Sequence, residues 1–221
     1  PHVADIGRIR EIVRTIESGS VVRMGGMTDC FQACESEHHV ARDTISLLNQ
    51  RGIHQLIVTK SDTVADCPTL DRTYSHIQVS ITSTSDEPNA FMENAPAPSK
   101  RMDAVRRLNE AGFDVSIRLS PYVPELVDLD YLRDRTGCGK VLVEFLRING
   151  NIKKVLQGFD FSPYRLKLGG YRHLPLKTKR AWLQPVLDRF DEVSVCEDVY
   201  SHWSVWRDTV NPNPDDCCNL R

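Results

Sequence analysis

Chemically active side chains follow a series of short apolar runs in this sequence. Hydroxyl, lysine, arginine and carboxylate groups recur at or near the ends of these runs, and such a set can bind a zwitterion that also carries hydroxyl groups. The cations would pair with a carboxylate, the carboxylates with an ammonium group, and the hydroxyls with a ribose or amino-acid group. The residues concerned are Thr28, Asp29, Lys60, Ser61, Ser80, Thr82, Arg118, Ser120 and Glu144.

Glu144 differs from the others because it lies in the middle of an apolar run, VLVEFLR. Burying a carboxylate at such a position costs several kcal/mol unless a cation pairs with it. Arg118 and Arg147 are the available partners. Two interpretations remain open: a structural ion pair inside the fold, or a pair that lines a cavity and orients a ligand.

The elements that must position these residues alternate along the chain. Segments with helical spacing separate the apolar runs, a pattern typical of parallel strands covered by helices. This pattern predicts a single α/β domain over residues 1–221, in which the sheet is either doubly wound or rolled into a full or partial barrel. In a barrel the carboxyl ends of the strands converge on one face, which would gather the polar residues. The runs span residues 21–27, 54–60, 76–82, 113–121, 140–147 and 192–198.

Several classes of function lack their signature in this sequence. There is no G-x-G-x-x-G after the first apolar run and no G-x-x-x-x-G-K-[ST], so the dinucleotide and P-loop interpretations have no support. No apolar run approaches the roughly 20 residues that cross a membrane, and the chain does not open with a signal-peptide pattern. With 28 basic and 30 acidic residues the net charge is -2, so no global attraction to polyanions is expected.

The seven cysteines are an odd number and are scattered along the chain, which predicts a reduced, cytoplasmic protein. Cys30 and Cys34 have C-x3-C spacing, but Thr28 and Asp29 beside them are the stronger functional candidates. The adjacent pair Cys217 and Cys218 lies in an acidic tail. With Cys196 or Cys30 this pair could supply ligands to a metal or a second cluster, or it could have no such role.

Several segments, taken together and in order, resemble a known group of enzymes. The segments are GGMTDCFQ, IVTKSD, HIQVSIT, APSKRMDAVRRLNEAGFDVSIRLSP and VLVEFLR. They resemble the radical S-adenosylmethionine superfamily, and within it the spore photoproduct lyase-like, DNA repair photolyase-type branch. The resemblance is strongest over residues 20–150 and continues into GYRHLPL and SVCEDV. It implies a partial parallel (β/α)6 barrel.

The resemblance also implies a cofactor and a reaction. In this superfamily a C-x3-C-x2-C loop after the first strand holds a [4Fe–4S] cluster, S-adenosylmethionine binds to the open iron, and its reductive cleavage yields a 5′-deoxyadenosyl radical that abstracts hydrogen. By position, Thr28 matches a hydroxyl residue near the methionine part of the cofactor. Lys60 matches a lysine that pairs with its carboxylate, and Ser80 a serine near its ribose or amino-acid end. Arg118 and Glu144 match inward-facing positions. The implied partners are a nucleic-acid substrate and an electron donor such as flavodoxin or ferredoxin.

The sequence departs from the family pattern at the cluster motif. No C-x3-C-x2-C is present, because the third position after Cys30 and Cys34 is occupied by Glu37. The resemblance places MTDCFQ at the end of the family's second strand, so we expect the first strand and its cluster loop to lie outside this sequence, upstream of Pro1.

Three functions remain open at this stage. The first is a radical S-adenosylmethionine enzyme, or its barrel portion, of the lyase or transferase type if a cluster segment is present. The second is a catalytically silent barrel module that binds a nucleotide-like ligand without a cluster. The third is a metal-independent barrel enzyme that uses Glu144, Lys60 or Cys196 in acid–base or thiol chemistry.

Overall fold

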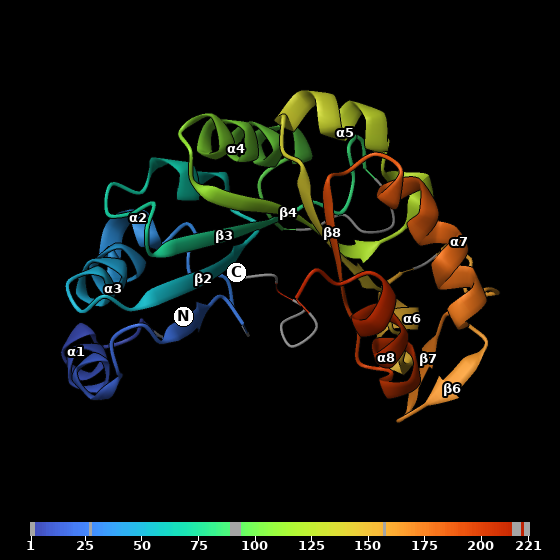
Figure 1. The fold of residues 1–221 in the computed structure, drawn as a ribbon, viewed down its shortest axis with the longest axis horizontal. Helices are drawn as coiled ribbons and strands as arrows, with labels where there is room; N and C mark the ends of the chain where they lie inside the picture. Colours follow the sequence, from blue (N-terminus) through green and yellow to red (C-terminus); the bar gives the residue numbers. More distant parts are fainter. Residues whose placement is uncertain (1–2, 27, 89–93, 157, 214–217, 219–221) are drawn as a thin grey trace.

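Six parallel strands form a single curved sheet in the order β1-β2-β3-β4-β5-β8. The computed structural model describes the chain except residues 1–2, 27, 89–93, 157, 214–217 and 219–221. Figure 1 shows the strands in an arc, and within the described part β1 and β8 end the sheet without pairing to each other. The predicted α/β partial parallel barrel is therefore confirmed. The strands are β1 (Val21–Met24), β2 (His54–Thr59), β3 (Ser75–Ser80), β4 (Asp114–Tyr122), β5 (Lys140–Phe145) and β8 (Glu192–Cys196).

Helices follow most of the strands, as the alternating pattern predicts. Helices α3, α4, α5 and α7 line the outside of the arc in Figure 1, and α4 packs on β3 and β4 while α7 packs on β8. Among the described residues, no helix combines the length and apolar character that crossing a membrane requires. The helices are α1 (Ile6–Thr15), α2 (Glu35–His38), α3 (Val40–Asn49), α4 (Pro98–Glu110), α5 (Leu129–Thr136), α6 (Gly150–Val155), α7 (Leu176–Leu187) and α8 (Tyr200–Thr209), with 3₁₀ turns η1 (Asp62–Asp66) and η2 (Pro124–Leu126).

Alternate positions of the strands point to opposite faces of the sheet, and the two faces differ in character. The outward positions carry branched apolar side chains that form the core beneath the helices, such as Ile77, Ile117 and Val195. The inward positions are largely polar. For example, Gln78 and Ser116 lie opposite each other in the β3–β4 register and line the interior. The core therefore lies between the sheet and the helices, and the concave face is left for polar contacts.

The helical spacing of apolar residues over residues 37–52 predicts one continuous helix, but the structure divides this segment. His39 has a φ of 55°, in the left-handed region, and separates α2 from α3. The Glu35 carboxylate accepts hydrogen bonds from the backbone N–H groups of Ala41 and Arg42, both at 2.9 Å. These bonds satisfy donors that would otherwise be unpaired at the start of α3, which is why the helix can begin anew there.

The stretch between β5 and α7 gives no periodic signal in the sequence, yet it is structured. It contains α6 and an antiparallel hairpin of β6 (Leu166–Leu168) and β7 (Tyr171–His173). Strands of three residues are too short to show an alternating pattern. The hairpin is joined to the rest by backbone hydrogen bonds between Ile148 and Arg172.

A hydrogen-bonded network crosses the amino-terminal ends of the strands. The Asp114 carboxylate contacts His76 Nδ1 at 2.6 Å and accepts from Lys140 Nζ at 2.8 Å, while His76 Nε2 lies 3.0 Å from His54 Nδ1. The hydrogen bond to His76, together with that to Lys140, lowers the pKa of Asp114 to about 2. Asp114 therefore joins β3, β4 and β5 at this end of the sheet.

We expect Asp114→Asn to destabilise the protein at neutral pH by about 1–2 kcal/mol, allowing for solvent screening of a side chain that is 32% exposed. Because the folded pKa lies below the ordinary value of 3.8, the stabilisation is complete above about pH 4 and is lost as the pH falls toward 2. Urea unfolding at pH 7 and at pH 2.5 measures both effects. Asp134→Asn, on the exposed side of α5, is the control. An equal difference between wild type and Asp114→Asn at both pH values would contradict the prediction.

Candidate functional site

A cavity of 580 Å³ opens at the carboxyl ends of the strands. Its size falls in the usual range for small-molecule sites. Several of the predicted site residues lie close together here, because the strands are parallel and end on the same side of the sheet. The predicted residues that line the cavity are Lys60, Ser80, Arg118, Ser120 and Glu144, together with Cys196.

The other predicted residues lie around this cavity rather than in it. Thr28 lines a neighbouring groove of 370 Å³ beside α1 and the loop after β1. Ser61 lines a second groove of 640 Å³, which shares Lys60 with the central cavity. Asp29 borders both grooves, and Thr82 is buried just beyond β3. The structure therefore brings together five of the nine residues and distributes the remaining four around them.

The contacts of Asp29 give it a positioning role. Its carboxylate accepts hydrogen bonds from the Thr59 hydroxyl at 2.7 Å, the Lys60 backbone N–H at 2.6 Å and the Phe31 backbone N–H at 2.9 Å. These bonds tie the loop after β1 to the end of β2 and thereby fix the backbone from which Lys60 projects. Ser61 has a similar local function, since its hydroxyl accepts from the Thr63 N–H at the start of η1.

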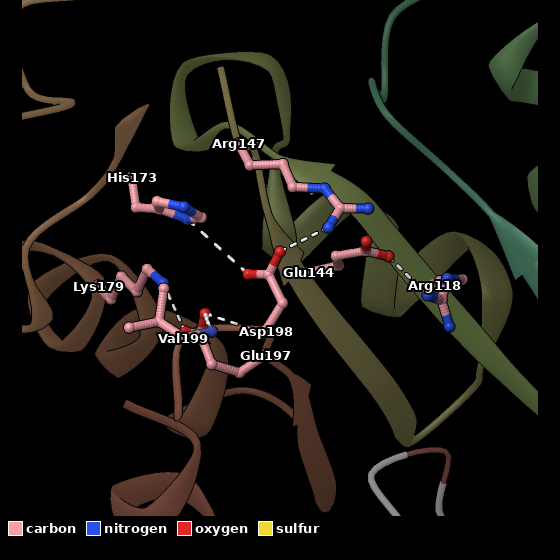
Figure 2. Close-up of polar contacts among 8 residues, drawn as sticks. All are labelled: Arg118, Glu144, Arg147, His173, Lys179, Glu197, Asp198 and Val199. Carbon is pink, nitrogen blue, oxygen red and sulfur yellow. Dashed lines mark hydrogen bonds and ion pairs between the residues drawn. The ribbon is translucent and has the colours of Figure 1, made fainter. Parts of the chain in front are cut away.

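The floor of the cavity is an ion pair between Arg118 and Glu144. Arg118 Nη2 donates to Glu144 Oε2 at 2.6 Å (Figure 2). The Ser120 hydroxyl donates to the same oxygen at 2.8 Å. Arg118 Nη1 donates to Gln78 Oε1 at 2.9 Å. Burial of the guanidinium opposes its charge, but Glu144 and nearby groups more than offset this, so the pKa of Arg118 lies above its ordinary value. Of the two partners expected for Glu144, the structure shows Arg118.

The wall of the cavity beside β8 carries a second set of charges. Arg147 Nη1 donates to Asp198 Oδ2 at 2.6 Å, and His173 Nδ1 lies 3.8 Å from Asp198 Oδ1. Figure 2 places the Asp198 carboxylate between these two side chains. Behind it, Lys179 Nζ donates to Glu197 Oε2 at 2.5 Å. Because Arg147 is paired with Asp198, the cavity has two separate cation–carboxylate pairs along its lining.

Some of these residues could be found from the sequence and others could not. Glu197 and Asp198 end the last apolar run as Lys60 ends the second, so the rule that identified Lys60 also identifies them. Gln78 has no such signal because it lies inside its strand and its amide is uncharged. Lys179 lies on α7, and only the packing of that helix on β8 brings its amine to Glu197.

The cysteines do not form a metal site within the described part of the chain. No group of three or more His, Cys, Asp or Glu residues there could hold a metal ion. Cys196 lines the central cavity, whereas Cys218 borders a small cavity near Asp114, and Cys217 lies outside the described residues. Burial, together with the nearby Asp29 carboxylate, raises the pKa of Cys30 to about 12.

Comparison with solved structures identifies the fold. Spore photoproduct lyase, solved as a single-site cysteine mutant, matches with a TM-score of 0.59 and 14% identity over 86% of this chain and 64% of that chain. The same enzyme complexed with dinucleoside spore photoproduct matches with the same TM-score at 15% identity. A double mutant of the enzyme with bound AdoMet and dinucleoside spore photoproduct also matches, with a TM-score of 0.59.

The relative found by comparison of sequences matches a smaller part of the chain. An uncharacterized protein of Methanocaldococcus jannaschii is 30% identical over 118 residues, which are 52% of this chain and 45% of that protein. No family model matches the chain. The chain thus spans about half the length of this relative and just under two thirds of the length of spore photoproduct lyase. Its fold is the partial barrel of spore photoproduct lyase, a radical S-adenosylmethionine enzyme, as the resemblance in sequence implies.

Proposed function

We propose that this chain is the barrel portion of a radical S-adenosylmethionine enzyme that acts on a nucleic-acid substrate. The observation that carries the proposal is the cavity at the strand ends, which lies in a spore photoproduct lyase-like barrel and is lined by both cations and carboxylates. Spore photoproduct lyase has been solved with AdoMet and a dinucleoside bound to it. The fold, the size of the cavity and its charges support the same use here.

The described residues fit the amino-acid end of S-adenosylmethionine. Lys60 offers an ammonium group for the carboxylate, while Glu144 and Asp198 offer carboxylates for the α-amino group. Ser80 is buried at the end of β3 and lines the same cavity, where its hydroxyl suits a ribose or amino-acid group. When bound beside a reduced cluster, this cofactor supplies a 5′-deoxyadenosyl radical. The role of this chain's residues is to bind and orient the cofactor and to keep the substrate next to it.

The described residues do not fit a [4Fe–4S] cluster. Such a cluster needs several thiolate ligands, and the part of the chain that the structure describes offers no group of three possible ligands. In our proposal the ligands of the cluster lie outside this sequence, and the electron comes from a donor of the flavodoxin or ferredoxin kind. The six described cysteines are in the reduced form, which suits a reducing, cytoplasmic setting.

A basic segment beside the cavity supports a polyanionic substrate. Between β5 and α7 the exposed cations greatly outnumber the acids, whereas the whole chain has a net charge of -2. The segment begins at Arg147, which lines the cavity. Phosphate groups of a nucleic acid are the natural counterions for such a cluster. The cations are Arg147, Lys153, Lys154, Arg165, Lys167 and Arg172.

Binding of S-adenosylmethionine tests the proposal directly. We expect the wild-type chain to bind it, and Lys60→Ala to raise the dissociation constant by about tenfold or more, because a charge-assisted hydrogen bond to the cofactor carboxylate is lost. Isothermal titration calorimetry under anaerobic conditions gives the constant. Lys177→Ala, which removes an exposed lysine from α7, should bind as tightly as wild type.

The outcomes separate this proposal from its alternative. Absence of binding by the wild-type chain, or equal affinity of Lys60→Ala and wild type, would overturn the assignment of the cofactor site. Iron and sulfide analysis of the natural gene product, purified anaerobically, then tests catalysis. A product that binds S-adenosylmethionine but holds no iron would favour the catalytically silent module instead.

A further inference from the structure

The exposed face of α8 carries a stack of aromatic and cationic side chains. The rings of Tyr200 and Trp203 are stacked, with centroids 5.9 Å apart and an interplanar angle of 27°. The guanidinium carbon of Arg207 lies 5.0 Å from the centroid of the Trp203 ring. These residues are spaced i, i+3 and i+7, so they project from the same side of the helix. Tyr200 ends the stack and is 78% exposed.

The opposite face of α8 is firmly anchored. Trp206 and His202 are buried there, and Trp206 Nε1 donates to Glu197 Oε2 at 3.2 Å. Glu197 also accepts from the Val199 N–H, directly before Tyr200, at 3.1 Å (Figure 2). The start of α8 is therefore held in place by these hydrogen bonds. Because this part of the protein is already ordered, stacking of a ligand on Tyr200 would cost little conformational entropy.

Along the chain, the stack begins just after the wall of the central cavity. Tyr200 follows Asp198 by two residues, and Asp198 lines the cavity wall where it pairs with Arg147. His173, at the end of β7, lies 3.8 Å from the same carboxylate, so the basic segment between β5 and α7 adjoins this point. A strand of nucleic acid that leaves the cavity past Asp198 would therefore pass the basic segment and the start of α8.

We propose that Tyr200, supported by Trp203 and Arg207, is a stacking platform for an unpaired base adjacent to the nucleotide held in the cavity. This inference rests on the proposed nucleic-acid substrate. Aromatic rings next to basic residues are the usual chemistry of single-stranded nucleic-acid binding, because every base has a π face and every phosphate a charge. An apolar peptide would match the rings but not the cations of the neighbouring basic segment.

Fluorescence titration of a short single-stranded DNA containing 2-aminopurine tests the platform, since stacking on an aromatic ring quenches this base. We expect the wild-type chain to quench it, and Tyr200→Ala to weaken binding by between about fivefold and about 150-fold with loss of the quench. Tyr200→Phe retains the ring and should bind like wild type. Tyr131→Ala removes another exposed tyrosine, on α5, and should also leave binding unchanged.

The results distinguish failure of the platform from failure of the proposed function. If wild type binds the DNA and Tyr200→Ala binds it with the same constant and the same quench, the platform is wrong while the nucleic-acid substrate stands. If wild type binds no nucleic acid, the substrate proposal fails and the platform fails with it. A second experiment reads affinity from the fluorescence anisotropy of a dye at the DNA end. Replacing the 2-aminopurine nucleotide by an abasic one should then weaken binding by wild type but not by Tyr200→Ala, and equal weakening for both proteins would overturn the platform.

Discussion

Replacement of Lys179 by methionine should lower the free energy of unfolding by about 3–5 kcal/mol. The side chains of Lys179 and Glu197 are 2% and 3% exposed, and the ammonium group is 2.5 Å from the carboxylate. Burial lowers the pKa of Lys179, and the nearby Glu197 carboxylate opposes that change. Methionine fills a similar volume but leaves Glu197 as a buried charge without its cation. The loss is therefore electrostatic rather than a loss of packing.

Urea or thermal unfolding followed by circular dichroism measures this change. Lys177→Met lies on the same helix but removes an exposed lysine, so its free energy of unfolding should stay within about 0.5 kcal/mol of wild type. If Lys179→Met proved as stable as Lys177→Met, the ion pair would contribute nothing to the free energy of unfolding. The hydrogen bonds that Glu197 accepts from the Val199 N–H and from Trp206 Nε1 would then be sufficient to stabilise its charge.

Gly25→Ala is the second substitution for which we expect a large effect. Gly25 follows β1 with a φ of 85°, a conformation that L side chains rarely adopt. A Cβ atom added there would overlap the backbone carbonyl oxygen of Val58, at the end of the neighbouring strand β2. Because backbone cannot move aside as a flexible side chain can, β1 and β2 would have to separate. We expect a loss of about 3 kcal/mol or more in the free energy of unfolding.

The neighbouring glycine supplies the control. A Cβ atom added to Gly26 would meet only Arg23 Nε, at an ordinary contact distance of 3.8 Å. Gly26→Ala should therefore unfold within about 0.5 kcal/mol of wild type in the same denaturation experiment. Equal stability of the two alanine variants would show that the close approach of β1 to β2 is not maintained in solution.

The strands could be predicted from the sequence with small errors at their ends. Each of the six apolar runs contains or closely matches a strand of the sheet, because a buried parallel strand must be apolar over several consecutive residues. The hairpin β6–β7 and the break at His39 could not be predicted. The hairpin is too short to carry a pattern, and the break depends on the Glu35 carboxylate, whose partners only the fold brings near.

The candidate site was predictable only in part, for a similar reason. The strand ends identify Lys60 and Ser80 because topology alone brings such residues to one face. Strand order and register decide which charges pair, and neither follows from periodicity. Thus Glu144 on β5 pairs with Arg118 on the neighbouring strand β4. Arg147 was an equally available partner in the sequence, but in the structure it pairs with Asp198.

The opposite character of the two faces of the sheet has a consequence for how this protein can change over time. Outward positions such as Ile117 hold the helices, while inward positions one residue away, such as Arg118, face the ligand space. The residues that stabilise the fold and the residues that determine ligand preference thus alternate along the same strands. Substitutions could accumulate on the concave side and alter what is bound there, with the helix-covered core left intact.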